Sequence, residues 1–179
     1  ADLKERVRRD RVPYDRWIAE GYITATEGNV VDYDVIRAQL TGAVNHPQVS
    51  GTPILQQITL DEMAIDRWNA TQIVTQLMGD GVNVAEFGQG FASMSAPSKE
   101  LERLLGLHAL NHGNNPVARW MAGCTSFAAD AAENIKPVKP ERRKSIKRID
   151  GIVALIMVLG RFIAVPKEPP PQPPGIMFV

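Results

Sequence analysis

The sequence has little of what several protein classes need. Its 179 residues include one cysteine, Cys124, so neither an intrachain disulfide nor a thiolate metal cluster can form. We therefore expect a reducing, cytoplasmic location and a buried structural role for Cys124. Long apolar runs are absent too, because the ten residues between Asp150 and Arg161 fall short of the roughly 18 that a membrane span needs. No membrane partner is expected.

The sequence also lacks an excess of charge of either sign. Its 20 Lys and Arg residues balance 20 Asp and Glu residues, which weighs against a general nucleic-acid-binding protein. The balance hides a local asymmetry, since residues 136–148 hold seven basic side chains against one acid, Glu141. A Gly-x-x-x-x-Gly-Lys-Ser/Thr pattern is missing, which excludes ATP hydrolysis by a phosphate-binding loop within this polypeptide.

The first third of the chain predicts short elements. Residues 1–20 favour helix with a break at Pro13, and residues 32–40 favour a second helix. Between them, residues 22–31 have the pattern of a small β-hairpin. Residues 45–53 are rich in Asn, Pro, Ser and Gly and predict a loop.

A strand–helix–strand unit follows. Apolar residues predict a strand over 58–66, a helix from about Asn69 to Gly79, and a parallel strand over 82–87. Asp66 then lies at the carboxyl end of a strand, the edge at which α/β sheets bind ligands. The alternative is that Asp66 merely helps to cap the helix.

The second half predicts helices around a hairpin. Ser95 and Pro97 are expected to open a helix that reaches His108, and residues 117–124 form a short helix. Residues 125–140, with spaced prolines, favour a hairpin or extended loop whose acids, Asp130 included, are ordinary turn residues. Residues 166–174 hold six of the thirteen prolines and predict polyproline II, followed by the apolar residues 176–179.

Asp150 stands at the start of an apolar segment that we interpret as a core helix. An aspartate in the first turn is stabilised by the helix dipole and can point out of the core towards a ligand. The alternative is an N-cap with a salt bridge to Arg148 or Lys147.

Several segments together resemble one known family. They are Asp10-Arg11-Val12-Pro13-Tyr14, Gln89-Gly90 after the strand–helix–strand unit, Met94-Ser95-Ala96-Pro97, His112-Gly113-Asn114-Asn115-Pro116-Val117 with Trp120, and Lys147-Arg148-Ile149-Asp150-Gly151. In this order they resemble the C-terminal nuclease domain of tailed-phage terminase large subunits, over residues 8–164. The resemblance implies an α/β, ribonuclease H-like nuclease fold with a mixed sheet flanked by helices.

The resemblance also implies an activity and a site. Large terminases package viral DNA, and their nuclease cuts concatemeric DNA with two divalent metals, Mg²⁺ or Mn²⁺, held by aspartates. Carried over, Asp66 and Asp150 are catalytic metal ligands, and Asp130 is a weaker candidate ligand. The residues expected to contact DNA phosphates are basic: Arg143, Lys144, Lys147 and Arg148. The implied partners are double-stranded DNA, the phage portal and the small terminase subunit, in the host cytoplasm.

Two features of the family are missing from this sequence. Large terminases carry an ATPase domain and a first nuclease strand that supplies another aspartate, so we expect an N-terminally truncated nuclease domain over 1–165 and a proline-rich tail over 166–179. The alternative is a catalytically impaired remnant that acts as a docking or DNA-binding module for portal or motor assembly. Self-association through an exposed sheet edge or the C-terminal tail is a further expectation.

Overall fold

The structure is a computed structural model that describes residues 2–28, 31–66, 68, 71–140 and 146–164. The helices are α1 (Leu3–Asp10), α2 (Tyr14–Ala19), α3 (Tyr33–Thr41), α4 (Thr71–Gly79), α5 (Phe91–Gly106), α6 (Pro116–Gly123) and α7 (Asp150–Ala164), with a 3-10 turn at Ile54–Gln56. The strands are β1 (Met63–Ile65), β2 (Val84–Glu86), β3 (Ser126–Ala129) and β4 (Ile135–Val138).

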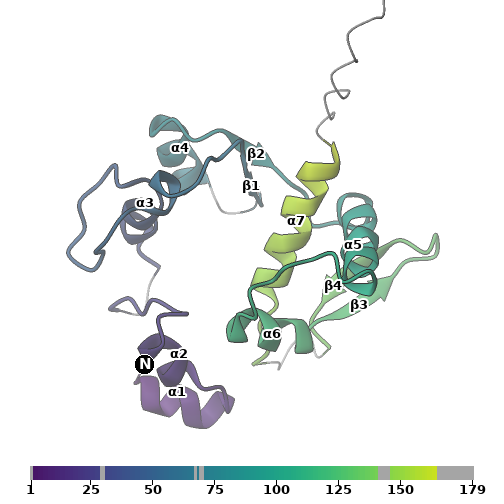
Figure 1. Cartoon of the computed structure of the whole chain (residues 1–179), viewed down its shortest axis with the longest axis horizontal. Coiled ribbons are helices and arrows are strands. Elements are labelled where there is room, and N and C mark those ends of the chain that lie inside the picture. Colours follow the sequence, from purple (N-terminus) through teal and green to yellow (C-terminus); the bar gives the residue numbers. More distant parts are fainter. Residues whose placement is uncertain (1, 29–30, 67, 69–70, 141–145, 165–179) are drawn as a thin grey trace, which may run out of the picture.

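Helix α7 runs through the middle of the molecule, as predicted for a core helix (Figure 1). It packs against α5, and the two helices share a core of buried side chains: Met94, Leu101, Ile156, Met157 and Leu159. Burying each large apolar side chain contributes about 1.5–3 kcal/mol, which outweighs the modest helix propensity of the Ile and Val residues. The side chain of Ile156 is fully buried and marks the centre of this core.

The predicted strand–helix–strand unit is confirmed. Strands β1 and β2 are parallel, with Ile65 opposite Glu86, and α4 connects them. Ile73, Leu77 and Val82 form a second core beneath this unit, and α3 packs against α4. Strand β1 is shorter than predicted, because only Met63–Ile65 finds a partner strand, and Ile58 is about half exposed. An ion pair between Glu62 and Arg161 fastens β1 to α7 at 2.6 Å.

Of the two alternatives predicted for residues 125–140, a hairpin and an extended loop, the structure shows the hairpin. Strands β3 and β4 pair antiparallel, and β4 packs against α5. The backbone N–H of Ile135 donates to Ser95 Oγ at 3.2 Å, so the buried hydroxyl of α5 fixes the hairpin in place. The resemblance implies one mixed sheet. The described residues contain two separate two-stranded sheets, one parallel and one antiparallel.

Helices α1 and α2 form a separate corner of the molecule (Figure 1). Trp17 is buried and its ring centroid lies 5.7 Å from that of Trp120 on α6. Asp10 is buried at the end of α1, where it accepts hydrogen bonds from Arg9 and from the Tyr14 hydroxyl. An aromatic contact between Trp17 and Trp120 therefore joins this corner to α6.

Two predicted elements are wrong. The described part of residues 22–31 contains no strand, because the N–H groups of Tyr22 and Ile23 instead bond the Trp17 carbonyl and end α2. Helix α5 begins at Phe91 rather than at Ser95, so Pro97 lies inside it. Pro97 is buried together with Met94, Ser95 and Ser98, and this packing compensates for the hydrogen bond that the proline cannot donate.

No helix in the described part of the chain is long and apolar enough to cross a membrane.

Candidate metal site and its surroundings

Asp66 directly follows β1, at the carboxyl end predicted for it. The Ile65 carbonyl accepts the N–H of Phe87 at 2.8 Å, so the exits of β1 and β2 are held side by side. The Asp66 side chain is partly buried, and its Oδ1 accepts the Trp68 N–H at 3.3 Å. That bond is a turn contact that ends three residues before α4 begins, so it does not cap that helix. Among the described residues, no donor bonds Oδ2 of Asp66.

Asp150 is the first residue of α7 and its side chain is exposed. The Ile149 carbonyl accepts the first helical hydrogen bonds, from Ile152 and Val153 at 2.9 Å each. Among the described residues no group hydrogen-bonds to the Asp150 carboxylate. The guanidinium of Arg148 donates instead to the carbonyls of Ile146 and Lys147, so the structure does not show the alternative salt bridge between Asp150 and Arg148. Within the part of the chain that the structure describes, Asp150 thus presents a carboxylate without a hydrogen-bond partner at a helix N-terminus.

Asp130 lies in the turn between β3 and β4. Its Oδ1 accepts the N–H groups of Ala132 and Asn134 at 2.9 Å, and its Oδ2 accepts the Asn134 side-chain amide at 3.0 Å. The Asn134 side chain and backbone hold the pKa of this carboxyl below its usual range. These bonds support the turn interpretation of Asp130, and its role as a metal ligand stays a prediction.

The structure does not gather these acids into a complete metal site. Phe87, hydrogen-bonded to β1 beside Asp66, lies against Gly160, because a Cβ on that glycine would fall 2.5 Å from the Phe87 ring. Asp150 is ten residues earlier in α7, about 15 Å along the helix axis from Gly160. Within the described residues, no group of three His, Cys, Asp or Glu side chains could hold a metal ion.

The chemistry of Asp66 and Asp150 nevertheless fits a hard divalent cation. Each offers at least one carboxylate oxygen without a hydrogen-bond donor in the described part of the chain, and Mg²⁺ and Mn²⁺ prefer such ligands. The roles of Asp66 and Asp150 as metal ligands stay predictions, because the described residues do not bring the two carboxylates together.

One acid beside Asp66 was missed in the sequence analysis. Glu86 is the last residue of β2, it is exposed, and it stands opposite Ile65 in the parallel register. Its position at the carboxyl end of a predicted parallel strand is the same signal that identified Asp66.

The predicted DNA-contacting residues are only partly visible. Lys147 is partly buried and Arg148 is exposed, both immediately before α7, while Arg143 and Lys144 lie outside the described residues. The positive charge of Arg148 acts on Asp10 and Tyr14, so Arg148 lies near the α1–α2 corner. Arg9, through its hydrogen bond, is the main reason why the pKa of Asp10 is lowered.

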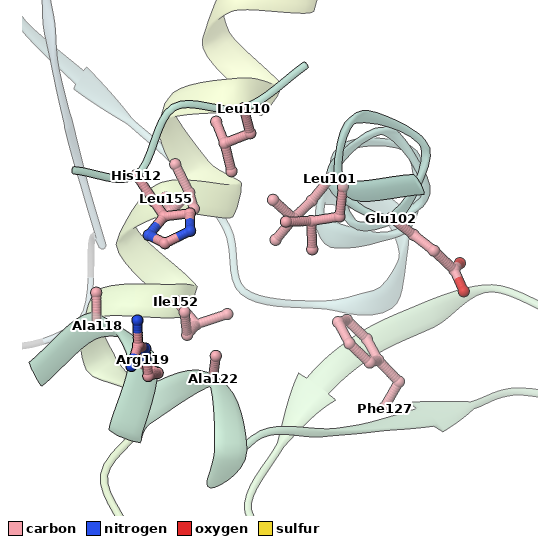
Figure 2. Close-up of a pocket in the computed structure, with 11 residues that line it drawn as sticks. Leu101, Glu102, Leu110, His112, Ala118, Arg119, Ala122, Phe127, Ile152 and Leu155 are labelled. Atoms are coloured by element: carbon pink, nitrogen blue, oxygen red, sulfur yellow. The ribbon is translucent and has the colours of Figure 1, made fainter. Parts of the chain in front are cut away.

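A pocket of about 450 Å³ opens beside the start of α7, between α5, α6, α7 and β3 (Figure 2). Leu101, Phe127 and Ile152 converge on it from three different elements, whereas Glu102 points away from its centre. The walls are apolar, and the pocket therefore differs in chemistry from the acidic residues described above.

Comparisons with known proteins agree with the fold. The family model for the terminase large subunit, endonuclease domain, matches residues 1–165. The chain is 34% identical over 160 residues to the terminase large subunit of Enterobacteria phage HK97, a match covering 88% of this chain and 29% of that protein. Protein YmfN of Escherichia coli strain K12 is 31% identical over 165 residues, covering 92% of this chain and 34% of YmfN.

A solved structure is similar as well. The crystal structure of the HK97 bacteriophage large terminase matches 89% of this chain with a TM-score of 0.74 and 34% identity, over 31% of its own length. The fold is accordingly the ribonuclease H-like fold of that nuclease. The chain spans about a third of the length of these relatives. On the family match and this similarity together, the chain belongs to the endonuclease-domain family of terminase large subunits.

Proposed function

We propose that the chain supplies the nuclease function of a phage DNA-packaging motor, cutting concatemeric viral DNA in a reaction that depends on two divalent metals. The observation that carries this proposal is the placement of two carboxylates with available oxygens, one at a strand exit and one at a helix N-terminus, in a chain of this family. Asp66 and Asp150 are the residues to which we assign the metals, Mg²⁺ or Mn²⁺.

The assigned residues have defined tasks. When bound, the metals would lower the pKa of a water molecule and stabilise the leaving oxygen of the phosphodiester. Asp66 is held by β1 and by the turn to Trp68, so its carboxylate is fixed before a ligand arrives. Asp150 is anchored through α7, whose apolar face is buried in the main core. Secondary structure fixes each carboxylate on its own element. A shared two-metal site therefore requires the start of α7 to lie closer to the end of β1 than it does in this structure.

We infer that acidic residues other than Asp66 and Asp150 complete the metal site. Among the described residues, β1 has one neighbouring strand, β2, and its other edge has no strand beside it. Two-stranded sheets are rarely stable alone, and an open edge is a template for another strand. A strand added there would lie next to Asp66 and could bring a further carboxylate. The same edge is the surface that we assign to self-association.

The substrate and partners follow from the same proposal. Double-stranded DNA would be held through its phosphates by the basic segment before α7, namely Arg143, Lys144, Lys147 and Arg148. Because that segment leads directly into Asp150, phosphates bound there would lie next to the assigned metal ligand. The portal and the small terminase subunit are the proposed assembly partners, and the host cytoplasm is the proposed location.

The test is nicking of supercoiled plasmid by the full chain with Mn²⁺, Mg²⁺ or a chelator. We expect metal-dependent cutting that falls by about 100-fold or more in Asp66→Asn and in Asp150→Asn, because each change removes a charged metal ligand. Calorimetric titration with Mn²⁺ should show the same loss. Asp61→Asn is the matched control, since this exposed acid lies just before β1 and away from the strand exit.

The outcomes separate the parts of the proposal. Cutting that persists in both variants would overturn the assignment of Asp66 and Asp150. A folded parent chain that never cuts, with any of the metals, would overturn the proposal that this chain alone carries the nuclease activity.

A further inference from the structure

The apolar pocket beside α7 is a surface that the described residues leave uncovered. Leu105 of α5 and Phe127 of β3 line it, and their side chains are 51% and 47% exposed. Its polar side chains are few, and Arg119 contributes one of them from α6. A volume of about 450 Å³ lies in the range that accommodates a ligand or a few side chains. Apolar surface of this kind usually has an occupant.

The chain itself contains a segment of matching chemistry. Residues 165–179, which lie outside the described residues, follow α7 and include Ile176, Met177 and Phe178 in a row. Three adjacent large apolar side chains gain about 1.5–3 kcal/mol each from complete burial. The pocket offers Leu, Ile, Ala and Phe side chains for that burial, so segment and pocket are complementary.

The distance between them is short enough. The pocket residues of α7 are Ile152 and Leu155, which lie twelve and nine residues before Ala164, or about 18 and 14 Å along the helix axis. Neighbouring helices add a lateral step of about 8–10 Å. Eleven residues, 165–175, would span about 34 Å if extended at the polyproline II rise of about 3.1 Å per residue, which is long enough for Ile176 to reach the pocket of its own chain.

The composition of the connecting residues favours such a contact. Six of residues 166–174 are proline, which limits the backbone entropy that docking must overcome. Gly175 directly precedes the apolar residues and allows the chain to turn into the pocket. A tether to the same molecule also raises the effective concentration of the segment to the millimolar range. These features favour the same chain over a second copy as the occupant.

We propose that residues 176–178 dock into the pocket formed by α5, α6, α7 and β3 of the same chain. The docked segment covers Phe127 and Leu105 and packs along α7 close to Asp150. The pocket is thereby an intramolecular docking site for the tail. This inference does not depend on the proposed nuclease function, and its test uses no activity measurement.

The test is site-directed disulfide formation in the full chain. The buried Cys124 is replaced (Cys124→Ala), and a cysteine pair is introduced as Met177→Cys with Ala122→Cys. Ala122 is exposed and its side chain faces the pocket (Figure 2), so this pair should close rapidly into an intrachain disulfide. The matched control pair is Met177→Cys with Val158→Cys. Val158 is 57% exposed, does not line the pocket and is nearer to the root of the tail.

The expected result is monomeric disulfide in the pocket pair that forms at least tenfold faster than in the control pair, measured by mass spectrometry under mild oxidation. Adding Phe178→Asp to the pocket pair should reduce its rate to that of the control, because a carboxylate is costly to bury among apolar side chains. Equal rates in the two pairs would overturn the proposal, as would a disulfide-linked dimer in place of the monomer. A rate that Phe178→Asp leaves unchanged would overturn it too.

Discussion

A charge pair between Asp80 and Arg37 joins two helices that are distant in the sequence. Asp80 follows α4 and is 6% exposed, and the guanidinium of Arg37 on α3 donates to both of its carboxylate oxygens. Thr41 Oγ1 adds a hydrogen bond to Oδ2 at 3.3 Å. The Arg37 hydrogen bond holds the pKa of Asp80 below its usual range, so the folded protein favours the ionised form.

The pair gives the stability of the protein a defined dependence on pH. An aspartate in an unfolded chain has a pKa of about 3.9, and the folded value is lower, so the stabilisation is present above pH 5 and is lost as the pH falls through the folded pKa. We expect Asp80→Asn to lower the urea midpoint at pH 7, with a difference from the parent chain that shrinks below about pH 4. Urea unfolding at pH 7 and pH 3 measures both values.

The control for this prediction is Glu133→Gln, because Glu133 is exposed in the β3–β4 turn and should leave the midpoint unchanged. A difference between Asp80→Asn and the parent chain that stays constant with pH would show that the loss comes from packing rather than charge.

Local sequence pattern predicts the structural position of some acidic residues and not the partners of others. Asp66 was placed correctly at a strand exit because an apolar run stops there and helical spacing begins soon after. The partners of Asp80 could not be found in the same way, since Arg37 lies 43 residues earlier and local pattern carries no information on that distance. Glu86 was within reach of the strand argument but was overlooked beside its apolar neighbours.

Among the elements, α7 needs a glycine, Gly160, where it packs closely against Phe87 at the end of β2. A Cβ on Gly160 would lie 2.5 Å from two atoms of the Phe87 ring and 3.3 Å from Pro97 Cγ. We therefore expect Gly160→Ala to lower the free energy of unfolding by about 1–3 kcal/mol through overpacking, although alanine favours helix more than glycine does. Chemical denaturation of the two proteins measures the difference.

Gly123→Ala is the matched control, because Gly123 is also helical and a Cβ there would meet nothing within 4 Å. It should be neutral or stabilise the protein by up to about 1 kcal/mol. If Gly160→Ala were stabilising to the same extent, the close packing of α7 against Phe87 would be wrong.

Elements were predicted well where local pattern and packing agree. Helices α3, α4, α6 and α7 and the β3–β4 hairpin each have a periodic pattern bounded by Gly, Pro or Asn, and all are present. The start of α5 was misplaced because Pro97 is typical of a first turn, whereas burial against α7 extends the helix upstream. The strand predicted near Tyr22 failed since no other described strand pairs with it and its N–H group caps α2.

At the scale of the whole molecule, the described chain has two cores and a loosely attached corner. The larger core joins α5 to α7, and the smaller one lies under α3, α4 and β2. The corner made of α1 and α2 buries few apolar side chains, among them Val12 and Trp17. No sequence pattern predicted this division, because it depends on which apolar faces meet across the fold.

The division predicts that the corner opens independently of the cores. Trp17 is 5% exposed and contacts Trp120, so Trp17→Ala removes the main apolar contact between α2 and α6. Hydrogen exchange measured by mass spectrometry should show lost protection in α1 and α2, while amides of α5 and α7 exchange as slowly as in the parent chain. Tyr22→Ala, at a 47% exposed aromatic just beyond α2, is the control and should leave both regions unchanged. Protection that falls together in the corner and in α5 and α7 would instead mean one cooperative unit, in which the cost of losing Trp17 is shared by the whole fold.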